Sequence, residues 1–175
     1  MRILPELPIS KFLFKDSRTA IFWLIVRLYV GWQWWEAGYG KVVGPGSDKW
    51  VGSHAGAAVQ GFLMGALKKS SGAHPDVQSW YASFISNFAL HHTVLFSYMV
   101  AYGELFVAIG LILGLFTGLA AFFGGVMNVN YLFAGTVSTN PVLLILEIPL
   151  ILAWRVAGLI GVDRYLLPRL FKKKK

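Results

Sequence analysis

The stretch TVLFSYMVAYGELFVAIGLILGLF at residues 93–116, followed directly by TGLAAFFGGVMNVNYLFAG at 117–135, decides the fold. The two runs together contain one charged residue, Glu104 in the first run. About 20 predominantly apolar residues are enough for a helix to cross a bilayer, so each run predicts one membrane span. Because no linker separates the runs, we expect the two helices to lie antiparallel and side by side.

The composition of the whole chain also indicates a membrane protein. Of its 175 residues, 56% are hydrophobic and 14% are charged, and the mean hydropathy is +0.59. Soluble domains usually contain about 45–50% apolar and about 25% charged residues. Two further apolar segments, about 19–43 and about 141–162, are long enough to span. We therefore expect one all-α membrane domain over residues 1–175, a polytopic bundle of four transmembrane helices.

Residues 44–92, between the first two predicted spans, are more polar and begin with GPGSD at 44–48, a turn composition. Further along, apolar side chains recur at helical spacing, and serine, glutamine and asparagine occupy much of the rest. We expect amphipathic helices lying at the outer interface. They form either a packing cap over the bundle or a lid over a site that opens to the outer side. The apolar positions are Val77, Trp80, Tyr81, Phe84 and Phe88.

The net charge of +8 is concentrated at the two ends of the chain. The positive-inside rule places both basic tails, 1–18 and 163–175, in the cytoplasm, as an even number of spans requires. We expect a multi-pass protein of the cell (plasma) membrane, in contact with the lipid bilayer, and no nucleic-acid binding. The cations of the tails are Arg2, Lys11, Lys15, Arg18, Arg164, Arg169 and Lys172 to Lys175.

The chain has no cysteine, which excludes a thiol–disulfide relay, a cysteine-ligated iron–sulfur cluster and a c-type haem. The histidines give little support to a metal site. His91 and His92 are adjacent, so on a helix their side chains point about 100° apart, while His54 and His74 lie in the outer segment. No metal or haem is predicted. Electrons in a redox reaction would pass directly between substrates or through a partner's cofactor.

Ionisable residues inside membrane spans are costly and mark candidate functional sites. We expect Glu104, near the centre of its span, to pair with one of the two arginines nearer the cytoplasm. We expect Glu147 to face Lys41 or a histidine nearer the outer surface. The five ionisable residues in the predicted spans are Arg27, Glu36, Glu104, Glu147 and Arg155.

Two helix faces combine polar and small residues, because residues three or four apart share a face. Glycines on such a face allow a neighbouring helix or a flat ligand to approach closely. Asn130 points about 200° away from Asn128, so the two amides are not expected in one site. These faces either hold the bundle together by hydrogen bonds and ion pairs or line a ligand site. Their members are Arg27, Gly31, Trp34, Gly38 and Lys41 in the first span, and Gly124, Asn128, Tyr131 and Gly135 in the third.

Three blocks of sequence together resemble the DoxX/DoxD-like membrane proteins. The first is RLYVGWQW at 27–34 with AG at 37–38 and GK at 40–41, and the second is GE at 103–104 with GLILG at 110–114. The third runs from MN at 127–128 to FAGTVSTNP at 133–141. The blocks stand in the family's order and, with the residues around them, span about 27 to 165.

The resemblance implies a four-span helical protein. The DoxD-like branch includes the small subunit of thiosulfate:quinone oxidoreductase, which oxidises thiosulfate to tetrathionate and reduces a membrane quinone. That enzyme has a second subunit, so the resemblance also implies a partner subunit or a soluble redox partner. A homo-oligomer is a further expectation.

The leading hypothesis is an integral membrane oxidoreductase, or a subunit of one, that couples thiosulfate oxidation to quinone reduction. Two alternatives stay open: a non-catalytic membrane anchor for a soluble redox partner, and a small-molecule or ion pathway lined by the same charges. The catalytic candidates are Glu104 as proton donor and Arg27 and Lys41 as donors to a quinone carbonyl. The candidate contacts of the quinone are Trp34, Gly38, Asn128 and Tyr131, and those of an anionic substrate are His91, His92 and Glu147.

Overall fold

The computed structural model describes residues 5–171, and this part of the chain is helical with no strand. Arg2 and Lys172 to Lys175, which contribute to the predicted basic tails, lie outside the described residues. The helices are α1 (Pro8–Lys15), α2 (Ala20–Val42), α3 (Ala57–Lys68), α4 (Ser79–Asn87), α5 (Thr93–Leu113), α6 (Thr117–Phe133), α7 (Asn140–Leu152), α8 (Trp154–Ala157) and α9 (Asp163–Leu170), with short 3-10 turns at Ser17–Thr19, Ser47–Lys49 and Ala89–His92.

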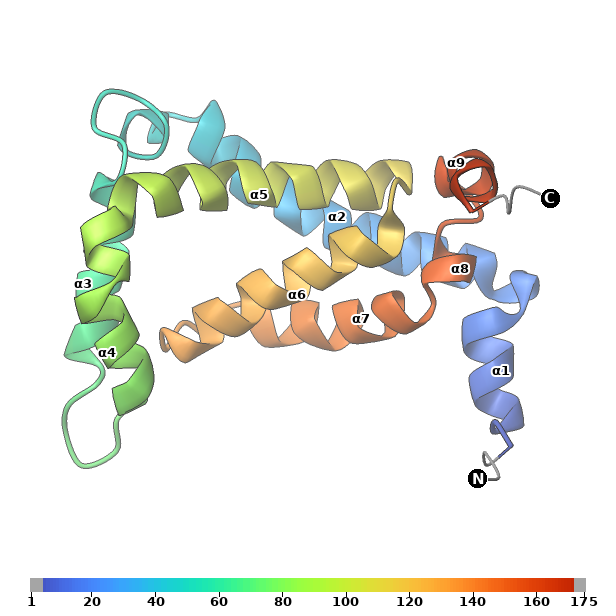
Figure 1. The fold of residues 1–175 in the computed structure, drawn as a ribbon, viewed down its shortest axis with the longest axis horizontal. Coiled ribbons are helices and arrows are strands. Elements are labelled where there is room, and N and C mark those ends of the chain that lie inside the picture. The colour runs from blue at the N-terminus through green and yellow to red at the C-terminus, as the bar shows by residue number, and fades with distance from the viewer. Residues whose placement is uncertain (1–4, 172–175) are drawn as a thin grey trace.

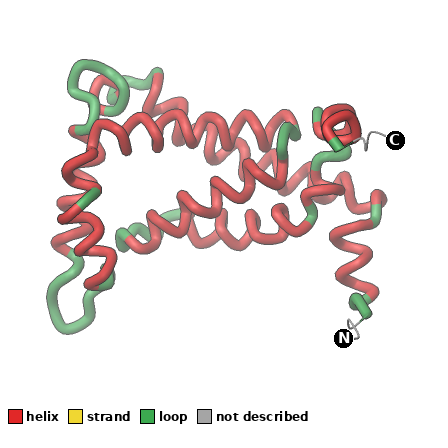
Figure 2. The backbone as a smooth tube through the Cα atoms, viewed as in Figure 1, coloured by secondary structure: helices red, strands yellow, loops and turns green. Residues whose placement is uncertain are grey.

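Four helices form a closed ring: α2 packs on α5, α5 on α6, α6 on α7, and α7 on α2 (Figure 1). The α5–α6 and α6–α7 connections are short, whereas residues 43–92 separate α2 from α5 (Figure 2). The α5–α6 turn needs left-handed backbone at Gly114 (φ +65°) and Phe116 (φ +47°), a conformation that glycine adopts at little cost. Helices α5 and α6 begin at Thr93 and Thr117, where the two apolar runs of the sequence begin.

The two ends of the ring are covered differently. At one end, the α3/α4 end, these two helices lie across the ends of the long helices (Figure 1). They have their own small core, in which Leu63, Val77 and Ile85 are buried. At the other end, the α1/α9 end, α1, α8 and α9 lie together (Figure 1). The stripe predicted at residues 77–88 therefore includes a real helix, α4, that caps the ring.

The ring is apolar outside and contains polar groups inside. Its buried side chains include those of Arg27, Glu104, Asn128 and Glu147. The outer surface of the ring exposes large apolar side chains from all four helices, and surfaces of this kind mark contact with a membrane or a protein partner. We call this surface the apolar belt; it includes Ile21, Ile25, Trp32, Leu95, Met99, Phe106, Leu119, Phe122, Phe123, Val142, Ile145 and Ile148.

Among the described residues, one helical stretch, Ser79–Leu113, meets both a length and a hydropathy criterion for crossing a membrane. It consists of α4, the 3-10 turn Ala89–His92 and α5. Helices α6 and α7 contain 17 and 13 residues, which is shorter than that criterion. Helix α2 has 23 residues but includes Arg27, Glu36, Lys41 and several tryptophans, which lower its hydropathy.

The last apolar segment is not one continuous helix, in contrast to the expectation for 141–162. Helix α7 ends at Leu152, Ala153 interrupts it, and only the short α8 follows. Pro149 lies in the last turn of α7, and a proline inside a helix removes one backbone hydrogen bond and introduces a clash with the preceding turn. The chain then turns at Gly158 and enters α9 at Asp163.

Candidate functional site

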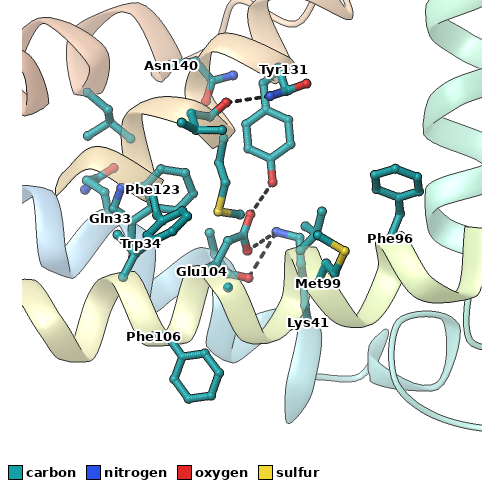
Figure 3. A pocket seen from close by; sticks show the side chains of 18 of the residues that line it. Gln33, Trp34, Lys41, Phe96, Met99, Glu104, Phe106, Phe123, Tyr131 and Asn140 are labelled. Carbon is teal, nitrogen blue, oxygen red and sulfur yellow. Dashed lines mark hydrogen bonds and ion pairs between the residues drawn. The ribbon is translucent and has the colours of Figure 1, made fainter. Parts of the chain in front are cut away.

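A buried carboxylate, Glu104 in the middle of α5, is the centre of the site (Figure 3). The Lys41 ammonium donates to its Oε2 at 2.6 Å, and the Tyr131 hydroxyl donates to its Oε1 at 2.7 Å. The three side chains come from α5, α2 and α6, so the site forms only when these helices pack together. We call these three residues the Glu104 triad. Each carboxylate oxygen has one donor, and one of the two donors carries a positive charge.

A close approach of α2 to α5 places this ion pair. A Cβ added at Gly38 would lie 2.8 Å from the backbone nitrogen of Leu105 and 3.1 Å from Cβ of Glu104. Only a glycine allows the helices to be this close. One turn further along α2, Lys41 then reaches Glu104, while its ammonium also lies 5.0 Å from the centre of the Trp50 ring.

Burial differs between the two charges of the pair. The Glu104 side chain is 2% exposed and that of Lys41 is 20% exposed. A carboxylate removed from water is stabilised by a cation at hydrogen-bond distance, and Lys41 supplies it. The prediction that Glu104 pairs with Arg27 or Arg155 is wrong. Arg27 lies fourteen residues before Lys41 on α2, about 21 Å along the helix axis at 1.5 Å per residue, and Arg155 lies over the ring of Trp154.

Arg27 instead connects the helix ends at the α1/α9 end. Its guanidinium donates to the backbone oxygens of Ala157 at 3.2 Å and Ile160 at 2.8 Å. A Cβ at Gly114 would lie 1.8 Å from Nη1 of Arg27, and one at Gly161 would lie 2.7 Å away. The α5–α6 turn and the end of α8 thus enclose Arg27, which is 1% exposed. Its contacts hold the fold together and place it outside the Glu104 triad.

A second buried carboxylate, Glu147 on α7, has neutral donors. The Trp34 indole N–H donates to Oε1 at 2.7 Å, and the Asn128 amide donates to Oε2 at 2.6 Å. Gly124 makes room for this cluster, because a Cβ there would lie 2.4 Å from Oε1 of Glu147. Glu147 is fully buried, so the expected contact with Lys41 or a histidine is wrong: its position on α7 faces Trp34 and Asn128 inside the ring.

A cavity of about 970 Å³ opens between α5 and α6, and the Glu104 triad lies on its wall. Its lining is predominantly apolar, with contributions from Met99, Phe106 and Phe123 (Figure 3). Residues of α3 and α4, including Phe62 and Tyr81, bound it at the α3/α4 end. Such a cavity suits an apolar ligand that carries one or two hydrogen-bond acceptors.

Trp34 links the cavity to the second carboxylate. It lines the cavity and its N–H donates to Glu147. Of the four predicted quinone contacts, Trp34 and Tyr131 are in the cavity wall. Gly38 is packed under α5, and Asn128 faces Glu147.

The predicted substrate contacts His91, His92 and Glu147 do not come together around this cavity. Both histidines lie in the 3-10 turn before α5, where Nδ1 of His92 donates to the backbone oxygen of Phe88 at 2.9 Å. His54 lies against Asp48 in the loop after α2, and hydrogen bonds from His54 and Ser53 lower the pKa of Asp48. Among residues 5–171, no group of three His, Cys, Asp or Glu side chains is placed to hold a metal.

Two polar contacts were not predicted from the sequence. The Tyr81 hydroxyl donates to Oδ1 of Asn130 at 3.1 Å, which attaches α4 to α6. Asp163 accepts from the backbone N–H groups of Phe116 and Thr117 and so caps the start of α6. Asn128 and Asn130 do face different partners, as the helical spacing predicts. The only sequence feature that pointed to the contact of Asp163 was its position as a short polar residue directly after the last apolar run.

Comparison with known proteins assigns the family. No curated protein and no solved structure matches the chain. The family model described as DoxX matches residues 22–136, which include α3, α4, α5, α6 and nearly all of α2. The matched range contains the whole Glu104 triad and ends before α7, which carries Glu147. The chain therefore belongs to the DoxX family of membrane proteins.

Proposed function

We propose that α2, α5, α6 and α7 each cross the bilayer and that the α1/α9 end faces the cytoplasm. The apolar belt supports this arrangement, because lipid is the solvent in which such an outer surface is favourable. The buried polar side chains support it as well, since ionisable groups in membrane proteins face the bundle interior. The basic residues of α1 and α9 support a cytoplasmic position for this end, because cytoplasmic segments carry an excess of lysine and arginine.

We propose that this protein is a quinone-linked membrane oxidoreductase or the membrane subunit of one. The observation that carries the proposal is the Glu104 triad on the wall of an apolar cavity. A quinone ring and tail are apolar, and each carbonyl accepts hydrogen bonds. Trp34 and the aromatic side chains of α6 supply flat surfaces for the ring, and Lys41 and Tyr131 supply the donors.

Each member of the triad has a distinct role in this proposal. Reduction of a quinone to a quinol consumes two electrons and two protons. Once protonated at Oε1, Glu104 donates to the Tyr131 oxygen, which frees the Tyr131 O–H to bind, together with the Lys41 ammonium, the carbonyl oxygen on which negative charge develops. Glu104 then passes its proton through Tyr131 to that oxygen and returns to the carboxylate form, and the other carbonyl oxygen takes the second proton from water. Lys41, which is partly exposed, connects Glu104 with the α3/α4 end for reprotonation.

The electrons come from an anionic donor, for which thiosulfate is our candidate, either directly or through a partner subunit. Two thiosulfate ions joined as tetrathionate release the two electrons that the quinone takes up. Arg27 has no part in this scheme, because its guanidinium donates to the backbone oxygens of Ala157 and Ile160 at and after the end of α8.

The test uses the membrane-extracted protein together with any subunit that copurifies. Solvent extraction should recover a bound quinone, and thiosulfate with a soluble quinone should yield quinol, followed by its ultraviolet absorbance. Glu104→Gln should lower the rate of quinol formation by at least 10²-fold, the lower range for loss of a general acid. Glu36→Gln, an exposed glutamate on α2, is the matched control and should leave the rate unchanged.

Equal rates for the native protein and Glu104→Gln would show that Glu104 is not the proton donor. Absence of both bound quinone and quinol formation, with a stoichiometric soluble partner present, would favour the membrane-anchor hypothesis instead.

A further inference from the structure

A second concave surface lies at the α1/α9 end. It is a groove of about 700 Å³ between α8 and α9, separate from the cavity of the Glu104 triad. Its apolar lining comes from Leu159, Leu167 and Phe171, and Arg155 and Arg164 line it as well. This combination of an apolar floor and guanidinium groups differs from the first cavity, whose one cation is already paired with Glu104.

The two arginines are held on aromatic rings. The guanidinium of Arg155 lies 5.0 Å from the centre of the Trp154 ring, and that of Arg164 lies 5.9 Å from the centre of the Tyr165 ring. Stacking on an aromatic face leaves the N–H groups at the edge of the guanidinium free to donate. A planar guanidinium with free edges binds the oxygens of a phosphate in a bidentate manner.

The acidic side chains of this end are already engaged. Within residues 5–171, Glu6 pairs with Lys15, and Asp16 pairs with Arg18 at 2.7 Å. Asp163, which also lines the groove, directs its carboxylate to the N–H groups of Phe116 and Thr117. In the same range, neither Arg155 nor Arg164 has a carboxylate within salt-bridge distance. The two guanidinium groups therefore outnumber the one carboxylate in the lining, and the groove has a net positive charge.

Exposed apolar side chains surround the groove at the α1/α9 end. Tyr165, Leu170 and Phe171 are 57–71% exposed, and on the neighbouring α1 Ile9 and Phe12 are exposed as well. Apolar side chains interleaved with cations are typical of surfaces that lie in the headgroup region of a bilayer.

We propose that the groove between α8 and α9 binds one anionic phospholipid. Arg155 and Arg164 bind the headgroup phosphate, and Leu159, Leu167 and Phe171 pack against the glycerol backbone and the start of the acyl chains. Basic pockets beside spanning helices on the cytoplasmic side recognise such headgroups. The proposal requires a membrane protein but does not depend on quinone chemistry.

The experiment titrates phosphatidylglycerol into the detergent-solubilised full chain and measures bound lipid by native mass spectrometry. Each arginine near a lipid surface contributes about 1 kcal/mol, a factor of about five in affinity. Arg155→Gln/Arg164→Gln should therefore weaken binding about 25-fold. The matched control, Lys11→Gln/Arg18→Gln, removes the same charge from the same end without touching the groove, and should change affinity less than about three-fold.

Two further arms identify the ligand. In the native chain, phosphatidylcholine should bind more weakly than phosphatidylglycerol. In the groove variant, the two lipids should bind with equal affinity. Inorganic phosphate at millimolar concentration should not displace the lipid, because it lacks the part that packs on Leu167 and Phe171. Equal loss in the control and groove variants, or displacement by inorganic phosphate alone, would overturn the proposal. Far-UV circular dichroism verifies that both variants keep their helices.

Discussion

The two buried carboxylates of the ring differ in the charge of their donors. Glu104 receives a hydrogen bond from an ammonium group and one from a hydroxyl, while Glu147 receives its bonds from the indole of Trp34 and the amide of Asn128. The ammonium donor adds a charge–charge attraction that the neutral indole and amide donors do not supply. Of the two, only Glu104 lines the cavity, and this position is the reason that the proposed proton-transfer role falls to Glu104.

The Lys41–Glu104 pair should show an asymmetric response to mutation. Lys41→Met leaves Glu104, which is 2% exposed, without a cation, and should lower the free energy of unfolding by about 2 kcal/mol. This is below the value for fully buried pairs because Lys41 is 20% exposed. Glu104→Gln should cost less, since Lys41 can still reach water.

The double variant Lys41→Met/Glu104→Gln should be more stable than Lys41→Met alone, because no charge is left uncompensated. Unfolding in a detergent titration measures all three variants. Additive effects of the two substitutions would contradict the coupling that the 2.6 Å contact predicts.

At the scale of helices, glycines set how closely α2 and α5 pack. A Cβ at Gly31 would lie 2.9 Å from Cγ1 of Ile112, and one at Gly38 would lie 2.8 Å from the backbone nitrogen of Leu105. Gly31 and Gly38 are seven residues apart and so lie on the same face of α2. They fix the position of α2 along α5, and that position brings Lys41 to Glu104.

Gly38→Ala should therefore separate the two helices and weaken the triad. Its Cβ meets backbone, which cannot rotate away, so a loss of about 1–3 kcal/mol is expected. Gly40→Ala on the same helix meets no atom within 4 Å and should leave stability unchanged or raise it slightly. Thermal unfolding in detergent compares the two variants, and an equal loss in both would refute the close-packing argument.

Sequence patterns located the helices better than the contacts between them. The starts of α5 and α6 follow from apolar runs, and the shared face of Trp34, Gly38 and Lys41 follows from helical spacing. The partner of Glu104 could not be predicted, because it depends on how far α2 is shifted along α5. The spacing of residues within one helix carries no information on that shift. Pro149 is the local signal for the break after Leu152, but the contacts of Arg27 with the backbone oxygens of Ala157 and Ile160 depend on tertiary packing and did not follow from the sequence.

At the scale of the molecule, the absence of cysteine makes the proposed topology directly testable. Each of three serines can be replaced by cysteine in a separate variant, and the introduced cysteine is then the only thiol in the chain. Ser17 is exposed at the α1/α9 end, Ser71 is exposed in the loop between α3 and α4, and Ser97 is fully buried on α5.

With four spans and cytoplasmic termini, a membrane-impermeant thiol reagent should label Ser71→Cys in intact cells and leave Ser17→Cys unlabelled. After the cells are permeabilised, Ser17→Cys should react as well, whereas Ser97→Cys should react only once the protein is unfolded. Labelling of Ser17→Cys but not Ser71→Cys in intact cells would reverse the orientation and move the lipid groove to the outer leaflet. Labelling of both would contradict the four-span arrangement, because the two serines lie at opposite ends of the same ring of helices.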